Sequence, residues 1–300
     1  MTDVHGKVAV VTGAGSGIGR ALAYELARRG AKLAVSDVDA SGLAETVKQL
    51  RVIGAPVHEA QLDVTDRAAV LSYADEVAAH YGAVHLVINN AGIAFTGDIA
   101  DMSFEQIERV MDVDFWGVVN GTKAFLPHLI AAGDAHLVNI SSLFGILSVP
   151  GQGAYNAAKF AVRGFTEALR QELLLAGHDV QVTCVHPGGV ATAIARNAGT
   201  VDKHDQESLA QFFDTKLAKT SPDSAARQIL RGVARNRPKV LVGLDAIVLD
   251  KVVRLLGSGY QRLGVRIAGR VMPARVAAKP GSRPSGGVPV DEKGRAKATA

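Results

Sequence analysis

The sequence predicts an α/β fold: a doubly wound parallel sheet of seven strands with helices on both faces. Over residues 1–243, short runs rich in β-branched residues alternate with helical stretches, which is the pattern of parallel strands joined by crossover helices. A glycine-rich segment joins the first of these runs to the first helical stretch. The chain of 300 residues is 48% hydrophobic and 21% charged, so it can form a large core.

The expected strands and helices follow one another along the chain without an internal repeat. The strands are predicted at Val8–Thr12, Leu33–Ser36, Val57–Leu62, Leu86–Asn89, Leu137–Ser141, Val180–His186 and Val240–Val242. The helical stretches include Ile18–Arg29, Arg67–Tyr81, Phe104–Ala131 and Tyr155–Ala176. The pair Ser221-Pro222 predicts the start of another helix, because serine caps helices and proline favours the first helical position.

Three regions differ in composition, and we expect them to differ in structure. Residues 1–243 form the predicted sheet domain. Residues 244–273 are expected to be a helical extension, with helices at Leu244–Leu256 and Tyr260–Met272 separated by the break Gly257–Gly259. Residues 274–300 are rich in alanine, lysine, proline and glycine, and their low apolar content predicts a disordered basic tail.

The positive charge of the chain is concentrated at its C-terminal end. Residues 251–300 contain 11 lysines and arginines against 2 acidic residues, whereas residues 1–250 contain 22 against 27. The sequence shows neither zinc-finger spacing nor an aromatic RNA-binding motif. We therefore expect no nucleic-acid partner.

Cysteine usage and hydropathy predict a cytoplasmic protein. The single cysteine, Cys184, can form neither an internal disulfide nor a cysteine-based zinc site, and no other cluster suggests a metal. The polar segment Met1–Lys7 leads directly into the first strand and leaves no room for a signal peptide. The longest mostly apolar stretch, Val240–Leu249, is too short to span a bilayer.

The glycine-rich segment predicts a phosphate-binding turn. Its pattern is TGxxxGxG, with Gly13, Ser16, Gly17, Ile18 and Gly19 at the start of the first helix. Glycines let the backbone approach a pyrophosphate, whose charge is favoured at a helix N-terminus. By itself the motif indicates a dinucleotide or a phosphate, and a tight turn without a ligand is the alternative.

The end of the second strand indicates which dinucleotide is preferred. Asp37 follows Gly17 by 20 residues, where a carboxylate accepts hydrogen bonds from a ribose and repels a 2′-phosphate. The residue before Gly17 is Ser16, so no cation inside the turn attracts that phosphate. We expect NAD to be preferred over NADP. The alternative is that Asp37 only caps a loop.

A tyrosine and a lysine four residues apart predict acid–base chemistry. Tyr155 and Lys159 share one helix face, and an ammonium one turn away favours the phenolate of a tyrosine that is otherwise a weak acid. Ser142 lies 13 residues earlier, at a strand end where such sheets place their ligands. The Tyr–Lys spacing alone is common on solvated helix faces, but the three residues together with the glycine turn are much more specific.

At this point the chain resembles the short-chain dehydrogenase/reductase family, from about Lys7 to Val242. The matching motifs, in the order of the family, are TGAGSGIG (Thr12–Gly19), Asp63-Val64, NNAG (Asn89–Gly92), NISS (Asn139–Ser142), YNAAK (Tyr155–Lys159) and PGGVAT (Pro187–Thr192). The resemblance implies a Rossmann-type fold and an NAD(P)-dependent oxidoreductase that acts on CH–OH groups.

The resemblance also implies residue roles. Tyr155 is expected to be the catalytic acid/base, Ser142 to bind the substrate oxygen, and Lys159 to bind the nicotinamide ribose while lowering the tyrosine pKa. Further cofactor contacts are expected from Asp63 and Val64 at the adenine, from Asn90, Ala91 and Gly92 on the adenosine side, and from Pro187, Gly188, Val190 and Thr192 at the nicotinamide.

One motif departs from the family pattern. Where the family has a catalytic asparagine in V-N-x-x-G, this chain reads Val113-Asp114-Phe115-Trp116-Gly117. In the family the backbone carbonyl of that asparagine holds a water in a relay towards the lysine, a role that Asp114 can keep. Its added carboxylate is also able to hold Lys159 charged. The departure motivates a second hypothesis, a sensor or scaffold that binds NAD(H) with little turnover.

The residues expected to face the substrate are mostly apolar. They are Phe95, Phe144, Val149 and Ile194, together with Phe212-Phe213 in the family's variable lid, residues 193–219. They favour an apolar secondary alcohol or ketone. The phenylalanine pair is equally consistent with packing of the lid. An NADPH-dependent 3-oxoacyl thioester reductase is the other enzyme hypothesis, and Asp37 disfavours it.

Two features concern partners. Phe115 and Trp116 indicate helix packing or a subunit interface, and we expect a homo-oligomer. Arg262, Arg266 and Arg270 recur every four residues beside an apolar stripe, which is typical of a helix lying on an anionic membrane. Glycines interrupt that helix, so we favour a fitted protein surface, such as the substrate lid or a neighbouring subunit, over a membrane.

Overall fold

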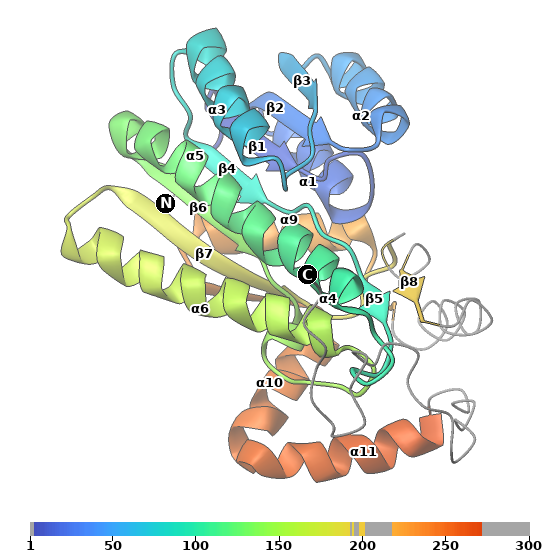
Figure 1. Ribbon diagram of the computed structural model, residues 1–300. Coiled ribbons are helices and arrows are strands. Elements are labelled where there is room, and N and C mark those ends of the chain that lie inside the picture. The colour runs from blue at the N-terminus through green and yellow to red at the C-terminus, as the bar shows by residue number, and fades with distance from the viewer. Residues whose placement is uncertain (1–2, 193, 195–197, 202–217, 272–300) are drawn as a thin grey trace, which may run out of the picture.

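A seven-stranded parallel sheet forms the centre of the molecule (Figure 1). The computed structural model describes residues 3–192, 194, 198–201 and 218–271. The strand order is β3-β2-β1-β4-β6-β7-β9. The strands are β1 (Val8–Thr12), β2 (Lys32–Asp37), β3 (Val57–Gln61), β4 (Leu86–Asn89), β6 (Ala135–Ile140), β7 (Val180–Pro187) and β9 (Lys239–Val242). The predicted fold class is confirmed.

The strand order reverses next to β1. Its neighbours are β2 on one side, where Val11 pairs with Val35, and β4 on the other, where Val11 pairs with Ile88. The chain therefore leaves β1 in one direction and later returns to its opposite edge. In such sheets ligands bind beyond the carboxyl ends of the strands at this reversal. The glycine turn follows β1 at that point.

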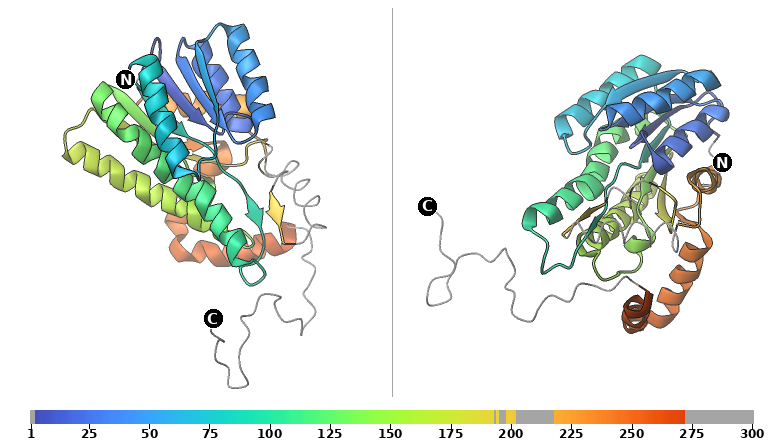
Figure 2. Two further views of the ribbon diagram at one scale, coloured as in Figure 1. Left: turned by 45° about the horizontal axis from the view of Figure 1, so that its top comes forward. Right: turned by 90° about the vertical axis from the view of Figure 1, so that its right-hand side faces the viewer.

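Helices cover both faces of the sheet (Figures 1 and 2). One layer contains α1 (Gly17–Arg28), α2 (Ala40–Ile53) and α9 (Pro222–Ala234), and the other contains α3 (Arg67–Tyr81), α5 (Gly117–Ala132) and α6 (Gly153–Leu175). Side chains of successive β1 residues enter opposite cores: Ala9 and Val11 lie in one, Val8 and Val10 in the other. All five residues of β1 are buried, which explains its continuous apolar sequence.

Capping side chains fix several helix starts. Asp39 and Asp66 accept hydrogen bonds from the first turns of α2 and α3, and Ser103 forms a capping box at the start of α4 (Phe104–Met111). Ser221 caps α9, whose first residue is Pro222. The predicted Ser221-Pro222 helix start is therefore confirmed.

The long helix expected at Phe104–Ala131 is interrupted. The helix α4 ends at Met111, a π-helical turn covers Asp112–Trp116, and α5 begins at Gly117. A π-helical turn holds one residue more than an α-helical turn and often occurs at functional sites. This turn contains Asp114.

The C-terminal extension forms two helices, α10 (Leu244–Leu256) and α11 (Tyr260–Val271), joined by a 3-10 turn at Gly257–Gly259. A short second sheet that the sequence did not indicate pairs β5 (Phe95–Thr96) with β8 (Gly199–Thr200). Most of the expected lid (193, 195–197 and 202–217) and the whole expected tail, 274–300, lie outside the described residues. Within the described part of the chain, no helix combines the length and apolar character needed to cross a membrane.

Candidate active site

The glycine turn after β1 requires each of its key glycines. Gly13 and Gly17 have φ angles of 64° and 53°, which favour glycine. A Cβ atom on Gly13 would lie 2.7 Å from Cα of Ala91, and one on Gly19 would overlap the carbonyl oxygen of Gly13. The backbone is therefore packed closely around the N-terminus of α1. Ser16, the N-cap of α1, is exposed and makes no side-chain cap hydrogen bond.

Hydrogen bonds tie the NNAG segment after β4 to this turn. The Thr12 hydroxyl accepts hydrogen bonds from the backbone N–H groups of Asn90 (3.0 Å) and Ala91 (3.1 Å). The Asn90 amide donates to the carbonyl oxygens of Thr12 and Gly13 at 3.0 and 3.1 Å. The Asn90 side chain thus holds two strand ends together and supports the expected adenosine side.

Asp37 lies at the end of β2 against the same turn. Its carboxylate accepts hydrogen bonds from the N–H groups of Gly15 (2.7 Å) and Asp39 (2.9 Å). A side chain on Gly15 would collide with this carboxylate, since its Cβ would lie 2.8 Å from Cγ of Asp37. The negative charge is therefore held beside the turn, where the sequence predicted an adenosine ribose.

Arg20 is a site residue that the sequence analysis missed. Its guanidinium donates hydrogen bonds to the carbonyl oxygens of Gly15 and Gly42 and to the hydroxyl of Thr46. This cation, one residue after the TGxxxGxG motif, therefore braces the turn against α2. The only sequence signal was its place directly after Gly19.

Asp63 and Val64, the residues expected at the adenine, follow β3. The Asp63 carboxylate is exposed and accepts hydrogen bonds from the N–H (2.9 Å) and hydroxyl (2.8 Å) of Thr65. Val64 is buried, and its carbonyl accepts a 3.0 Å hydrogen bond from the Asn120 amide. Both residues lie at the carboxyl end of the sheet, as expected.

The Pro187–Thr192 segment borders the glycine turn. Thr192 packs against the glycine turn, since a Cβ atom on Gly17 would lie 3.2 Å from its methyl carbon. The backbone N–H of Gly189 donates a 2.7 Å hydrogen bond to Asp245, in the first turn of α10. The sequence analysis missed Asp245, because nothing local to α10 indicates a partner 56 positions earlier.

The residues around the glycine turn fit a dinucleotide. Close backbone approach at Gly13 and Gly19, an uncapped helix N-terminus at Ser16 and a carboxylate at Asp37 are what a pyrophosphate and a ribose need. The predicted contact residues Ile18, Gly92, Gly188 and Val190 belong to the same segments. Among the described residues, no group of three or more His, Cys, Asp and Glu side chains is arranged to hold a metal ion.

The predicted catalytic residues come together from β6 and α6. Ser142 follows β6, and its hydroxyl accepts a 3.1 Å hydrogen bond from the Phe144 N–H. Tyr155 and Lys159 lie in α6, with the Lys159 ammonium 5.5 Å from the centre of the tyrosine ring. Lys159 is buried and Tyr155 and Ser142 are partly buried.

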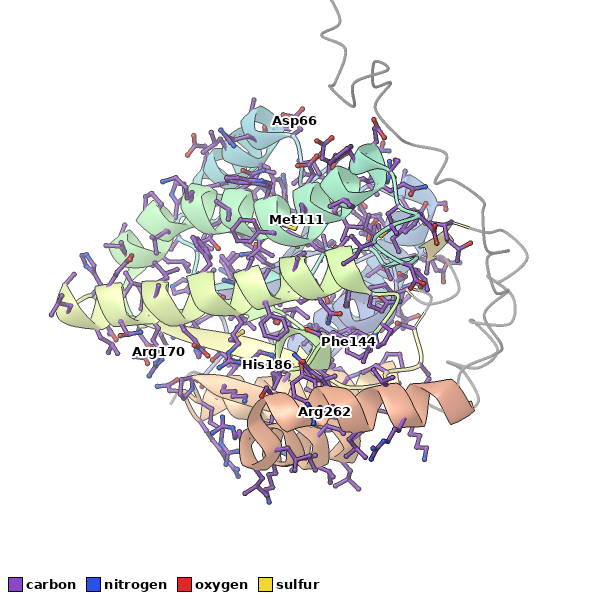
Figure 3. All side chains as sticks on the ribbon, turned by 60° about the horizontal axis from the view of Figure 1, so that its bottom comes forward. Asp66, Met111, Phe144, Arg170, His186 and Arg262 are labelled. Atoms are coloured by element: carbon purple, nitrogen blue, oxygen red, sulfur yellow. The ribbon has the colours of Figure 1, made fainter. Side chains whose placement is uncertain are left out.

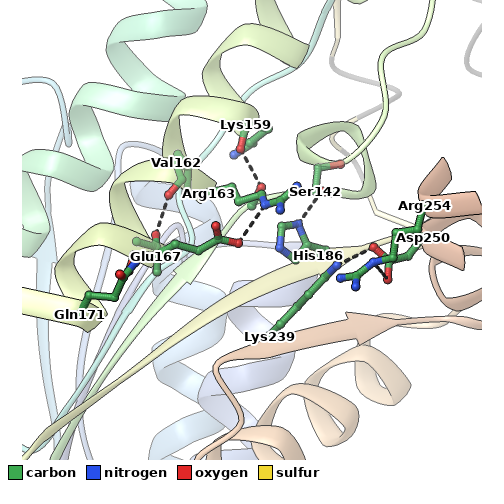
Figure 4. Close-up of polar contacts among 12 residues, drawn as sticks. Ser142, Lys159, Val162, Arg163, Glu167, Gln171, His186, Lys239, Asp250 and Arg254 are labelled. Carbon is green, nitrogen blue, oxygen red and sulfur yellow. Dashed lines mark hydrogen bonds and ion pairs between the residues drawn. The ribbon is translucent and has the colours of Figure 1, made fainter. Parts of the chain in front are cut away.

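His186 supports Ser142 from behind. Its Nδ1 atom lies 2.9 Å from the Ser142 carbonyl oxygen (Figure 4). Burial lowers the pKa of His186 to about 4, so the ring is neutral near pH 7. The carbonyl can only accept, so Nδ1 carries the hydrogen and donates it.

Asp114 is fully buried behind Lys159. Its Oδ2 atom lies 3.3 Å from Nζ of Lys159, and its Oδ1 atom accepts a 2.7 Å hydrogen bond from the Ile93 N–H. The carboxylate thus links the π-helical turn, the end of the NNAG segment and α6. The alternative that an added carboxylate holds Lys159 charged agrees with this contact.

The pKa of Tyr155 is raised in the structure, whereas the sequence predicted that Lys159 would lower it. Burial raises the pKa of Tyr155, Lys159 lowers it and Asp114 raises it, and the result lies above the ordinary value. Burial lowers the pKa of Lys159, but the attraction of Asp114 and Tyr155 outweighs burial, so that pKa is raised. Lys159 is therefore an ammonium, and it alone does not make Tyr155 acidic.

Of the expected substrate-facing residues, Phe144 directly contacts Tyr155, and Phe95 packs on the same apolar cluster as Tyr155. The Phe144 ring meets the Tyr155 ring edge-on at 6.2 Å. Phe144 and Val149 pack on one apolar cluster with Val253 and Tyr260 of the C-terminal helices, and Figure 3 shows Phe144 between α6 and these helices. Phe95 and Ile194 are partly buried. Phe212 and Phe213 lie outside the described residues.

Comparison with known proteins identifies the family. The family model described as short chain dehydrogenase matches residues 7–203. The chain is a short-chain dehydrogenase/reductase. It is 62% identical over 263 residues to a protein named oxidoreductase SadH from Mycobacterium tuberculosis, a match covering 88% of this chain and 95% of that one. The predicted family is thus confirmed.

Other short-chain dehydrogenases show how far this likeness extends. Human estradiol 17-beta-dehydrogenase 11 is 32% identical over 85% of this chain and 80% of its own length. A crystal structure of a short-chain dehydrogenase/reductase from Burkholderia phymatum in complex with NAD superimposes with a TM-score of 0.80 at 32% identity, covering 87% of this chain and 97% of that one. This short-chain dehydrogenase is therefore a nicotinamide-dependent oxidoreductase acting on CH–OH groups, which confirms the predicted enzyme class.

Proposed function

We propose that the protein interconverts an apolar secondary alcohol and its ketone with NAD(H), and that Tyr155 is the acid/base. The observation that carries the proposal is the grouping of Ser142, Tyr155 and Lys159 at the carboxyl edge of the sheet, with Phe144 against the tyrosine ring. This edge also holds the glycine turn, so a cofactor and a substrate can meet there.

The side chains have separate tasks in this mechanism. In reduction, Ser142 donates a hydrogen bond to the carbonyl oxygen and Tyr155 donates its proton to the same oxygen. In oxidation, the Tyr155 phenolate takes the proton from the alcohol. Lys159 stabilises the phenolate by its charge and binds the nicotinamide ribose. The bound nicotinamide supplies or accepts the hydride.

The preference for NAD over NADP rests on Asp37. Its carboxylate is held beside the glycine turn by the N–H groups of Gly15 and Asp39. A 2′-phosphate placed there would meet a fixed negative charge. Arg20, the cation nearest the turn in sequence, donates hydrogen bonds to the backbone carbonyls of Gly15 and Gly42.

The apolar substrate class rests on the residues beside Tyr155. Phe144, Val149 and Phe95 present little that could hydrogen-bond a sugar or bind a carboxylate. Human estradiol 17-beta-dehydrogenase 11 is named for an apolar secondary alcohol, which supports this class. The thioester-reductase hypothesis depends on NADPH and stays disfavoured by Asp37. The intact grouping of Ser142, Tyr155 and Lys159 favours turnover over a sensor.

We further propose that residues 1–243 form the catalytic domain and that the C-terminal helices close over it. Asp245 accepts a hydrogen bond from Gly189, near the expected nicotinamide contacts, and Tyr260 accepts one from Ser148, near the expected substrate residues. These contacts favour the protein's own surface over a membrane for the extension. Exposed Trp116 supports a homo-oligomer with contacts at the π-helical turn. The free thiol of Cys184 supports a cytoplasmic location.

A substrate screen tests the proposed function. The intact protein is incubated with NADH or NADPH and a panel of apolar ketones, 3-oxoacyl thioesters and keto sugars, and cofactor absorbance is followed. Ketone-dependent oxidation of NADH is expected. Tyr155→Phe should bind NADH but lose nearly all turnover, whereas the matched control Tyr24→Phe, on α1, should keep it. Near-normal rates in Tyr155→Phe would exclude Tyr155 as the acid/base.

A further inference from the structure

Asp114 forms a buried ion pair with Lys159, close to Tyr155. The Asp114 side chain is 0% exposed and that of Lys159 is 4% exposed. Two donors lie at the carboxyl: the Lys159 ammonium is 3.3 Å from Oδ2, as an ion pair without a hydrogen bond, and the Ile93 N–H donates to Oδ1 at 2.7 Å. An ionised carboxylate attracts the ammonium and accepts from the N–H, whereas a protonated carboxyl would direct its own hydrogen towards one of these donors.

The surrounding backbone packs tightly on this pair. A Cβ atom on Gly92 would lie 3.2 Å from Oδ1 of Asp114 and 3.3 Å from Nζ of Lys159, so the glycine of the NNAG segment leaves room for the two charges and nothing more. The π-helical turn Asp112–Trp116 brings Asp114 to this position. Because both side chains are buried, the two charges act strongly on each other and on Tyr155.

We propose that Asp114 is a positioning residue that offsets the charge of the Lys159 ammonium, so that Tyr155 stays protonated at neutral pH and is poised to donate to a carbonyl. The proposal rests on the proposed role of Tyr155 as acid/base. At neutral pH the protonated Tyr155 then favours carbonyl reduction, and alcohol oxidation requires more alkaline conditions.

The opposing effects of the two charges support this assignment. A lone ammonium beside Tyr155 would favour its phenolate, and a carboxylate behind that ammonium cancels part of the effect. Accordingly, burial raises the pKa of Tyr155, Lys159 lowers it and Asp114 raises it again. Cys184 of β7 is also close enough to act on the Lys159 charge, but burial raises the thiol pKa to about 12, so the thiol is neutral. In the described structure, Lys159 and Asp114 are thus the charged groups that act on Tyr155.

Burial opposes the ionised form of Asp114 and outweighs Lys159 and the Ile93 N–H, which favour it, so the pKa of Asp114 lies above its ordinary value. The proposal requires that raised pKa still to lie below neutral pH. If it lay above neutral pH, Asp114 would be a neutral acid and would leave the tyrosine unaffected. The two cases differ in one measurable quantity, the pH at which Tyr155 ionises.

The test is a spectroscopic titration of Tyr155 in the intact protein. The phenolate absorbance is recorded as pH rises, and the same curve from a Tyr155→Phe protein is subtracted so that only Tyr155 contributes. Asp114→Asn keeps an acceptor for Ile93 and removes the charge. Asp112→Asn is the matched control, because it removes an exposed carboxylate from the same π-helical turn.

The midpoint for Tyr155 should fall by about one pH unit in Asp114→Asn, the typical effect of removing one nearby buried charge. It should stay at the wild-type value in Asp112→Asn. An unchanged or raised midpoint in Asp114→Asn overturns the proposal. Asp114→Ser, which is also neutral, gives the same test if the asparagine variant does not fold.

Failure of this inference is distinguishable from failure of the proposed function. If Tyr155→Phe abolishes turnover but the Asp114→Asn midpoint does not move, Tyr155 is the acid/base and Asp114 does not set its charge. If Tyr155→Phe retains turnover, the proposed function itself is wrong. As a second readout, the pH profile of kcat for alcohol oxidation should move to lower pH in Asp114→Asn, in step with the midpoint.

Discussion

The phenol oxygen of Tyr260 accepts a 3.0 Å hydrogen bond from the backbone N–H of Ser148, although the two residues are 112 positions apart in the chain. The segment that contains Ser148 also carries Phe144, whose ring contacts Tyr155. The C-terminal extension is therefore connected to Tyr155 through one hydrogen bond, one apolar cluster and the Phe144 ring.

Loss of the Tyr260 hydroxyl should weaken substrate binding. Tyr260→Phe keeps the ring in the apolar cluster and removes the acceptor for Ser148, a hydrogen bond worth about 1 kcal/mol. We expect KM for a ketone substrate to rise about fivefold, with NADH affinity unchanged, as measured by steady-state kinetics and fluorescence titration. An unchanged KM would separate the extension from substrate binding.

Removal of residues 257–300 should distinguish the two surfaces proposed for the extension. If α11 closes over the substrate segment, the truncated protein folds, its KM or oligomeric state changes, and the intact protein does not bind anionic vesicles. We expect this outcome. Salt-sensitive vesicle binding that disappears on truncation, with unchanged kinetics on a soluble substrate, would instead assign the arginine stripe to a membrane.

Replacing Asp37 should reverse the cofactor preference. Asp37→Ser removes a charged hydrogen-bonding group worth about 1.5–3 kcal/mol, so NADH affinity should fall roughly ten- to hundredfold while NADPH affinity rises. Fluorescence titration with each cofactor measures both. Glu45→Gln, which neutralises an exposed acid on α2, should leave both affinities unchanged. Equal affinities in the wild-type protein would refute the assigned preference.

Asp245 should matter for the cofactor although it lies in the extension. Asp245→Asn weakens the charged acceptor of the Gly189 N–H, next to the residues expected at the nicotinamide. Loss of about 1.5 kcal/mol there raises Kd for NADH about tenfold. The control Asp223→Asn changes an exposed acid on α9 and should have no such effect. Equal Kd values for the two variants would show that Asp245 has only a structural role.

Buried His186 should make stability depend on pH. Its pKa falls from 6.5 to about 4 on folding, so the unfolded chain binds more protons between these values. The contribution of His186 to the free energy of unfolding is therefore fully present above pH 6.5. It is lost as pH falls towards 4, and its size is about 3 kcal/mol. Chemical denaturation at several pH values measures the slope. His186→Gln should reduce the slope, and an unchanged slope would assign it to other groups.

Local patterns in the sequence predicted much of the fold and part of the site. Runs such as Val8–Thr12 are apolar because both faces of the sheet are covered, so the chain itself indicates a buried parallel strand. The spacing of Tyr155 and Lys159 is fixed by the geometry of one helix. The Phe104–Ala131 helix was only partly correct, because periodicity does not reveal a single inserted residue at Asp112–Trp116.

The sequence by itself determined the sheet, the glycine turn, the pair on α6 and the family, because each depends on neighbours within one turn, one strand or one motif. The tertiary structure decided which charges act on that pair. Asp114 reaches Lys159 from another helix, Asp245 reaches Gly189 from the extension, and His186 reaches Ser142 from the neighbouring strand. These contacts join residues 44–56 positions apart, and only the packing of layers on the sheet brings them within hydrogen-bonding distance.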